Sequence, residues 1–107
     1  MTSVKFLADK DLYGFEISGH SSVDGDDEIG KIVCSAISSA AYMAANTITE
    51  IIGDKADIEI DDAVMRVKVK NPSRDTVNVL KGLKLHLTEL SDQYSNNIKI
   101  FGGAKKC

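Results

Sequence analysis

Hydrophobic and polar residues alternate along two runs near the start of the chain. The residues that share one face are Val4, Phe6 and Ala8 in the first run, and Tyr13, Phe15 and Ile17 in the second. A period of two is typical of a half-buried strand, and the polar stretch between the runs favours a turn. The first part of the chain is therefore predicted to form a β-hairpin that ends at Gly19-His20.

From Ile29 to Ile52 the apolar residues recur every three or four positions, which predicts a long helix. The residues of this stripe are Ile29, Val33, Ile37, Ala40, Ala44, Ile48 and Ile51. Gly53 follows, and glycine commonly stands just past a helix C-terminus. The serine, threonine and asparagine side chains in this helix make it a poor membrane span. We expect it to pack against a sheet or a second subunit, where its small side chains permit close approach.

The second half of the chain repeats this order of elements. Alternation over residues 56–71 predicts a second hairpin that turns at Asp61-Asp62, and residues 98–101 predict a last short strand. Between them, Asn71 or Ser73 can cap a second helix. The apolar residues of that helix are Val77, Leu80, Leu83, Leu87, Leu90 and Tyr94.

The resulting order, ββαββαβ, predicts an α+β fold with a mainly antiparallel sheet and two helices packed on one face. A chain of 107 residues fits a single domain, here residues 1–107. We expect a flexible acidic loop at about residues 21–29 and a frayed tail at about residues 102–107.

Composition bears mainly on partners and location. The net charge of −3 provides no basic surface of the kind that nucleic acid requires, so no direct nucleic-acid binding is expected. Neither a signal peptide nor a stop-transfer segment is recognisable. The protein is predicted to be cytoplasmic, without membrane association.

The chain has two cysteines, Cys34 and Cys107, too few for a disulfide framework, so Cys34 is expected to be a free thiol. A cysteine in a helix rich in small residues is most often a buried packing residue. Cys34, however, falls near the start of the helix, where unpaired N–H groups and the helix dipole favour a thiolate. The same N–H groups could stabilise an oxyanion.

His20 follows the second predicted strand, a position where a histidine is more often a surface residue than a base. One loop leads from it to the helix of Cys34, so the two side chains could come within reach. A Cys–His pair supports nucleophilic catalysis, because the imidazole takes the thiol proton and later protonates the leaving amine. Without further context this pairing is a weak signal.

The acidic loop has two compatible interpretations. It is either a solvated connection, whose acids Asp26, Asp27 and Glu28 favour the helix N-terminus, or a lid that orders over a substrate. The histidines and cysteines lack the short spacings of zinc ligands, so neither a metal nor a cofactor is predicted.

The motifs around these residues resemble the bacterial ribosomal-processing cysteine proteases. Gly19-His20-Ser21 matches the Gly-His-(Ser/Ala) at the end of that family's second strand, and residues 32–38 (IVCSAIS) match its cysteine-containing helix start. The order of elements extends the resemblance over essentially the whole chain. The resemblance implies that His20 is the general base and Cys34 the nucleophile, with Ser38 one helical turn beyond it. Gly19 and Ser21 would line the same site.

The resemblance further implies a substrate, the short N-terminal extension of a large-subunit ribosomal protein precursor, and a homodimer with the long helix near its interface. Many members carry an aspartate three residues before the cysteine, where this chain has Lys31. Asp26 or Asp27 would then orient His20, or the pair would work as a bare dyad. Lys31 could instead support the thiolate directly.

Two other classes of function remain open at this stage. In a noncatalytic ribosome-assembly or interaction module, Cys34 would merely pack in the core. In a redox-responsive thiol protein, reversible oxidation of Cys34 would change activity or assembly.

Overall fold

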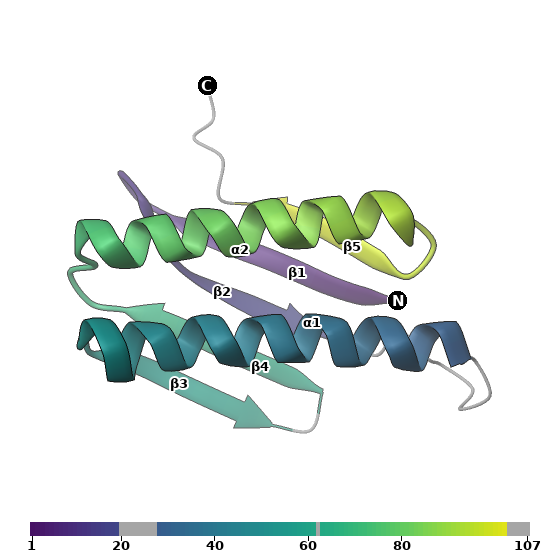
Figure 1. The fold of residues 1–107 in the computed structure, drawn as a ribbon, viewed down its shortest axis with the longest axis horizontal. Helices are drawn as coiled ribbons and strands as arrows, with labels where there is room; N and C mark the ends of the chain where they lie inside the picture. The colour runs from purple at the N-terminus through teal and green to yellow at the C-terminus, as the bar shows by residue number, and fades with distance from the viewer. Residues whose placement is uncertain (20–27, 62, 103–107) are drawn as a thin grey trace.

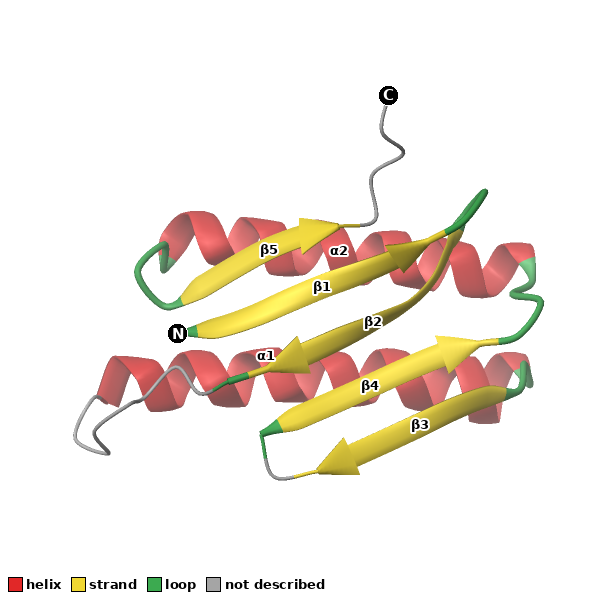
Figure 2. Cartoon of the chain, turned by 180° about the vertical axis from the view of Figure 1, so that it is seen from behind, coloured by secondary structure: helices red, strands yellow, loops and turns green. Residues whose placement is uncertain are grey.

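The computed structural model describes residues 1–19, 28–61 and 63–102. Two helices cover one face of a five-stranded sheet with the strand order β3-β4-β2-β1-β5, and the other face is left open (Figures 1 and 2). Neighbouring strands are antiparallel, except that β1 and β5 run parallel. The predicted α+β fold, with its ββαββαβ order and mainly antiparallel sheet, is confirmed.

The first hairpin consists of β1 (Thr2–Ala8) and β2 (Leu12–Ser18). Phe6 pairs with Phe15, and both rings are buried with their centroids 6.3 Å apart. The register shifts beyond Leu7, at the turn end of the hairpin. Leu12 therefore enters the core in place of Tyr13, and Ala8 is exposed, contrary to the predicted faces.

The predicted long helix consists of α1 (Glu28–Asn46) and a π-helical turn, η1 (Thr47–Ile52). It ends at Gly53, whose φ of 90° is the left-handed conformation predicted for a glycine at this position. The residues buried against the sheet are Val33, Ile37, Ala41, Ala44, Ala45 and Ile48. The two ends of the predicted apolar stripe do not pack on the sheet. Ile29 lies in the first turn of α1, which extends past the strands (Figure 1), and Ile51 lies in the π-helical turn. Both are exposed.

By length and composition alone, residues Glu28–Ile52 could cross a membrane, a test that the core helix of a soluble protein also passes. In this fold the segment packs its apolar face on the sheet.

The acidic loop was predicted at about residues 21–29. Residues 28 and 29 belong to α1, and residues 21–27 lie outside the described part of the chain.

The second hairpin consists of β3 (Ala56–Asp61) and β4 (Val64–Val69). Ile58 pairs with Val67 and Ile60 with Met65, so these side chains share the face on which the helices pack. Val67 and Met65 are buried, whereas Ile58 and Ile60, on the edge strand, are 40% and 58% exposed. The helical layer therefore does not cover β3.

The open face of the sheet carries paired charges. The Arg66 guanidinium of β4 lies between two carboxylates, donating from Nε to Glu16 Oε2 at 2.8 Å and from Nη1 to Glu59. These hydrogen bonds, chiefly the one to Glu16, raise the pKa of Arg66. This face is a solvated, charge-balanced surface.

The second helix, α2 (Arg74–Gln93), begins at Ser73, whose Oγ accepts a hydrogen bond from the Thr76 N–H at 3.3 Å. Ser73 is thus the capping residue, and Asn71 adopts a positive φ of 51° in the preceding turn. The apolar residues predicted for this helix are buried from Val77 to Leu87, and Leu90 and Tyr94 pack at the margin of the core. The chain then forms β5 (Ile98–Gly102), so the predicted tail begins beyond Gly102, outside the described residues.

Asp54 joins the end of the first helical segment to the start of α2. Its Oδ2 accepts hydrogen bonds from the Ser73 N–H (2.8 Å), the Ser73 hydroxyl (2.8 Å) and the hydroxyl of buried Thr76 (2.6 Å). The Ser73 N–H contributes most to lowering the pKa of the Asp54 carboxyl. This junction holds the two helices in a fixed relation on the sheet.

Candidate active site

Cys34 lies in the second turn of α1 as a half-buried free thiol. An α-helix leaves only its first four N–H groups without an internal partner, and α1 begins at Glu28. The N–H groups that lack a partner within the helix therefore precede Cys34 by about one turn. The predicted position of Cys34 near the start of the helix is confirmed, and its own N–H lies beyond the first four of the helix.

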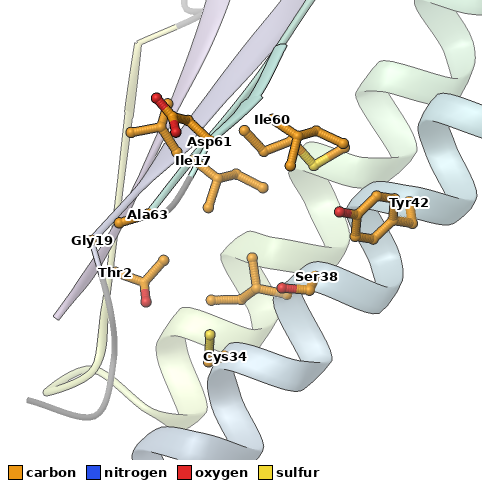
Figure 3. Close-up of a pocket in the computed structure, with 12 residues that line it drawn as sticks. Thr2, Ile17, Gly19, Cys34, Ser38, Tyr42, Ile60, Asp61 and Ala63 are labelled. Carbon is orange, nitrogen blue, oxygen red and sulfur yellow. The ribbon is translucent and has the colours of Figure 1, made fainter. Parts of the chain in front are cut away.

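A cavity of about 220 Å³ opens between α1 and the strands beside Cys34. Cys34 and Ser38 line it from the helix, and Gly19, Thr2 and Ala63 line it from the sheet (Figure 3). The thiol and the Ser38 hydroxyl lie on one flank of α1, since residues four apart share a helix face. The structure thus brings Cys34, Ser38 and Gly19 to one cavity.

Gly19 is held at the edge of this cavity by its backbone. Its N–H donates to the Ala63 carbonyl at 3.0 Å, and its φ is +86°. A Cβ at this position would lie 2.7 Å from the Met1 carbonyl oxygen. Both the conformation and the close approach require glycine, so the end of β2 is fixed against the starts of β1 and β4.

The lining residues that were not predicted include Tyr42, Thr2 and Ile60. Tyr42 continues the spacing of Cys34 and Ser38 along α1, so extending that interval of four would have found it. Thr2 and Ile60 reach the site only because the sheet places β1 and β3 on either side of β2 and β4. No local pattern in the sequence carries that strand order.

The other predicted site residues fall into two groups. Lys31 is exposed on α1 and does not line the cavity, so its role at the thiolate stays a prediction. The residues that lie outside the described part of the chain are His20, Ser21, Asp26 and Asp27. Within residues 1–19, 28–61 and 63–102, no group of three or more histidine, cysteine or acidic side chains could hold a metal ion.

Comparison with known proteins places this site in a family context. The family model described as cysteine protease Prp matches residues 1–99. The fold superposes on a crystal structure of the essential ribosomal processing protease Prp from S. aureus with a covalently linked product peptide. The TM-score is 0.83 at 20% identity, over 95% of this chain and 99% of that chain. No curated protein matches the sequence.

Two further crystal structures share the fold. The same S. aureus protease in complex with a substrate peptide gives a TM-score of 0.84 at 19% identity, over 95% of this chain and 99% of that one. The protein SMU.848 from Streptococcus mutans gives 0.82 at 20% identity, over 95% and 98% of the two chains. At these identities the structural likeness concerns the fold alone.

Proposed function

Because this chain belongs to the cysteine protease Prp family, we propose that it removes the N-terminal extension of a large-subunit ribosomal protein precursor, with Cys34 as nucleophile and His20 as general base. The observation that carries the proposal is the cavity that Cys34 and Gly19 line together. Gly19 immediately precedes His20 in the sequence. The related S. aureus enzyme is described as a ribosomal processing protease and has been crystallised with substrate and product peptides.

The chemistry follows from the two side chains. The His20 imidazole takes the Cys34 proton, and the thiolate attacks the scissile carbonyl to form a tetrahedral oxyanion. Collapse of this intermediate breaks the C–N bond, and the imidazolium protonates the departing amine. Water, deprotonated by the same imidazole, then hydrolyses the thioester and restores the thiol.

Ser38 is the described polar side chain of α1 placed one turn beyond the nucleophile in the same cavity. We assign its hydroxyl to positioning the peptide at Cys34, as a donor or acceptor of hydrogen bonds to the substrate backbone. Ser39, the next residue, lines a separate groove between the two helices and serves as the matched control. Ser38→Ala should lower kcat/KM about tenfold, the effect of one hydrogen bond to the bound peptide, while Ser39→Ala leaves it unchanged.

Charge supports a basic peptide as the substrate. The chain carries a net charge of −3, and Asp61 at the end of β3 lines the cavity. None of the described residues that line this cavity is a lysine or an arginine. Complementary charge raises the rate of encounter, so cleavage of a basic ribosomal precursor should slow as salt is added.

The decisive experiment is mass spectrometry of the ribosomal protein precursor from the same organism after incubation with this protein. The expected result is a precursor shortened at its N-terminus by the wild type and intact with Cys34→Ala. Cys34 is half-buried and the substitution removes one sulfur atom, so the variant should keep a near-native urea midpoint. Unchanged processing by a folded Cys34→Ala protein would rule out the mechanism.

The other classes of function predict different results. A noncatalytic assembly module would leave the precursor intact while the wild type binds ribosomal components. A redox-responsive thiol protein would instead show reversible oxidation of Cys34 that changes its activity or assembly, which intact-mass measurement before and after reduction detects.

We also propose that the enzyme acts in the cytoplasm as a homodimer. A free thiol is stable in a reducing compartment, and cell fractionation tests the location. A groove of about 650 Å³ between α1 and α2, lined by small residues that include Ala36, Ala40 and Gly82, supports close approach of a second copy. A Cβ at Gly82 would meet no atom within 4 Å, so Gly82→Lys should fold. It should also convert the dimer to a monomer in analytical ultracentrifugation, whereas an unchanged mass would place the interface elsewhere.

A further inference from the structure

A second cavity, of about 440 Å³, lies between α2 and the turn that joins β1 to β2, and we call it the lysine groove. Its charged lining residues are Lys10 and Asp11 of the turn and Lys81 and Lys84 of α2. Figure 2 shows this turn at the end of the hairpin opposite to the N-terminus. The seven residues of β2 span about 20 Å, so the groove is separate from the cavity at Cys34.

The groove lies where the register of the first hairpin shifts. Beyond Leu7 the pairing of β1 with β2 is irregular, so Leu12 enters the core and Ala8 is exposed. Both residues line the groove, together with Leu85 of α2, which is 61% exposed. Irregular strand pairs are common next to functional sites. The groove therefore combines aliphatic side chains with its lysines.

The lysines of the groove lack the carboxylate neighbours that lysines elsewhere in the sheet have. On the open face, Lys5 stands opposite Glu16 and Lys68 stands opposite Asp57 in the strand pairing. Within residues 1–19, 28–61 and 63–102, none of the three groove lysines forms a salt bridge, and neither does Asp11. The groove is thus locally positive, although the net charge of the chain is −3.

The sequence of α2 increases this charge and does not balance it. Residues three or four positions away from Lys81 or Lys84 are their neighbours on the helix surface, and none of these residues is acidic. The two lysines are themselves three residues apart, an arrangement that slightly destabilises a helix. Leu85 lies four residues beyond Lys81 on the same face. An anionic partner at this face would remove the repulsion between the two lysines.

We propose that the lysine groove binds an acidic segment of a partner protein. In this arrangement a leucine-sized side chain of the partner packs against Leu85 and Leu12, and its carboxylates lie beside the lysines. The aliphatic contact removes apolar surface from water, and the charges set which segments bind. The proposal does not depend on the proposed protease function, because no residue of the groove lines the cavity at Cys34.

Nucleic acid is the other large anion that lysines attract, and the lining of the groove disfavours it. Single-stranded nucleic acid binds by stacking its bases on aromatic rings, whereas the apolar residues of the described lining are all aliphatic. Asp11 can accept a hydrogen bond from a peptide N–H, but it would repel a phosphodiester. A peptide therefore fits the groove better than a phosphate backbone.

Fluorescence anisotropy with labelled model peptides tests the proposal on the whole chain. The probe is a short peptide of glutamates around one central leucine. Two comparison peptides carry alanine in place of the leucine, or lysines in place of the glutamates. We expect saturable binding of the probe that weakens as salt is added, and binding about tenfold weaker for each comparison peptide. Cys34→Ala should bind the probe as the wild type does.

Two variants of the groove should each weaken binding of the probe about tenfold. One is the double charge reversal Lys81→Glu with Lys84→Glu, and the other is Leu85→Ser. None of these side chains is buried, so both proteins should keep urea midpoints near that of the wild type. The matched control is Lys55→Glu with Lys99→Glu, two exposed lysines outside the groove that give the same change of net charge. The control should retain binding.

Three results would overturn the proposal. The first is the absence of saturable binding at millimolar concentrations of the probe. The second is equal binding by the wild type, the groove variants and the control. The third is tighter binding of a single-stranded oligouridylate than of the probe, which would assign the groove to nucleic acid. Failure of the protease proposal is a separate result, because it appears as an intact ribosomal precursor whether or not the probe binds.

Discussion

Replacement of Gly19 by alanine tests whether the end of β2 is held in the conformation that serves the site. Gly19 has a φ of +86°, and Gly53, at the end of η1, has a φ of +90°. A Cβ at Gly53 would meet no atom within 4 Å, whereas a Cβ at Gly19 would lie 2.7 Å from the Met1 carbonyl oxygen. The two glycines therefore share the backbone strain and differ in the clash.

The magnitudes follow from these two terms. A left-handed conformation costs an alanine roughly 1–2 kcal/mol, offset in part by roughly 0.4–1 kcal/mol from the reduced freedom of the unfolded chain. Gly53→Ala should therefore lower the free energy of unfolding by about 1 kcal/mol. At Gly19 the backbone must also move to relieve the clash, and overpacking of this kind costs roughly 1–3 kcal/mol more. Gly19→Ala should then lose about 3 kcal/mol in total.

Urea unfolding and thermal melts of the two variants measure this difference. A domain of this size loses about 4–8 °C in Tm per kcal/mol, so the two midpoints should differ by more than about 8 °C. Gly19→Ala should also slow alkylation of Cys34 by peptidyl probes, because Gly19 lines the cavity. Gly53→Ala should leave that rate unchanged. Equal stability of the two variants, together with normal alkylation in Gly19→Ala, would refute the account of Gly19.

Four further changes have definite expected outcomes. Asp54→Asn should lower the free energy of unfolding at pH 7. The folded-state pKa of Asp54 lies below the ordinary Asp value of 3.8, so the carboxylate stabilises the fold above pH 3.8, and this stabilisation is lost as the pH falls through the lowered pKa. In urea unfolding, the difference between the variant and the wild type should therefore shrink as the pH falls below 3.8. Ser73→Ala removes the α2 cap and should cost about 1 kcal/mol in the same assay. Ile37→Ala should cost about 2–5 kcal/mol, because Ile37 is 1% exposed in the core. Arg66→Lys should change the urea midpoint little, because its ion pairs lie at the solvated face of the sheet, and a large loss would contradict that placement.

The elements of this fold were predictable because their signals are local. Periods of two and of three to four residues predicted the strands and both helices, and Gly53 marked the end of the first helix. The sequence offered Asn71 and Ser73 as caps of the second helix, and the structure selects Ser73. The burial of Leu12 in place of Tyr13 was not predictable, since it depends on a register shift between β1 and β2. Cross-strand register is set by contacts between distant residues, so single-strand alternation does not report it.

The candidate site was predictable to the same extent. Ser38 was named through the family resemblance, and the structure places Cys34 and Ser38 on one flank of α1 beside the cavity. The opposite half depends on strand order, which brings Thr2 and Ile60 to the same cavity from strands that are not neighbours. The exposure of Ile60 could not be predicted either. Alternation shows which side of the sheet a side chain lies on, but it does not show whether a helix covers that side.

The widths of the two layers explain why a cavity forms beside Cys34. Five strands spaced about 4.8 Å apart span roughly 19 Å between the outer strands, and the two helices leave the outermost strand, β3, uncovered. The helical layer is therefore narrower than the sheet, and β3 extends beyond α1 with Ile58 and Ile60 uncovered. The flank of α1 that carries Cys34 faces this uncovered margin (Figure 3). A third helix packed over β3 would bury Ile58 and Ile60 but would also close the cavity beside Cys34. The uncovered edge therefore leaves apolar surface exposed, and the same opening gives a peptide access to the thiol.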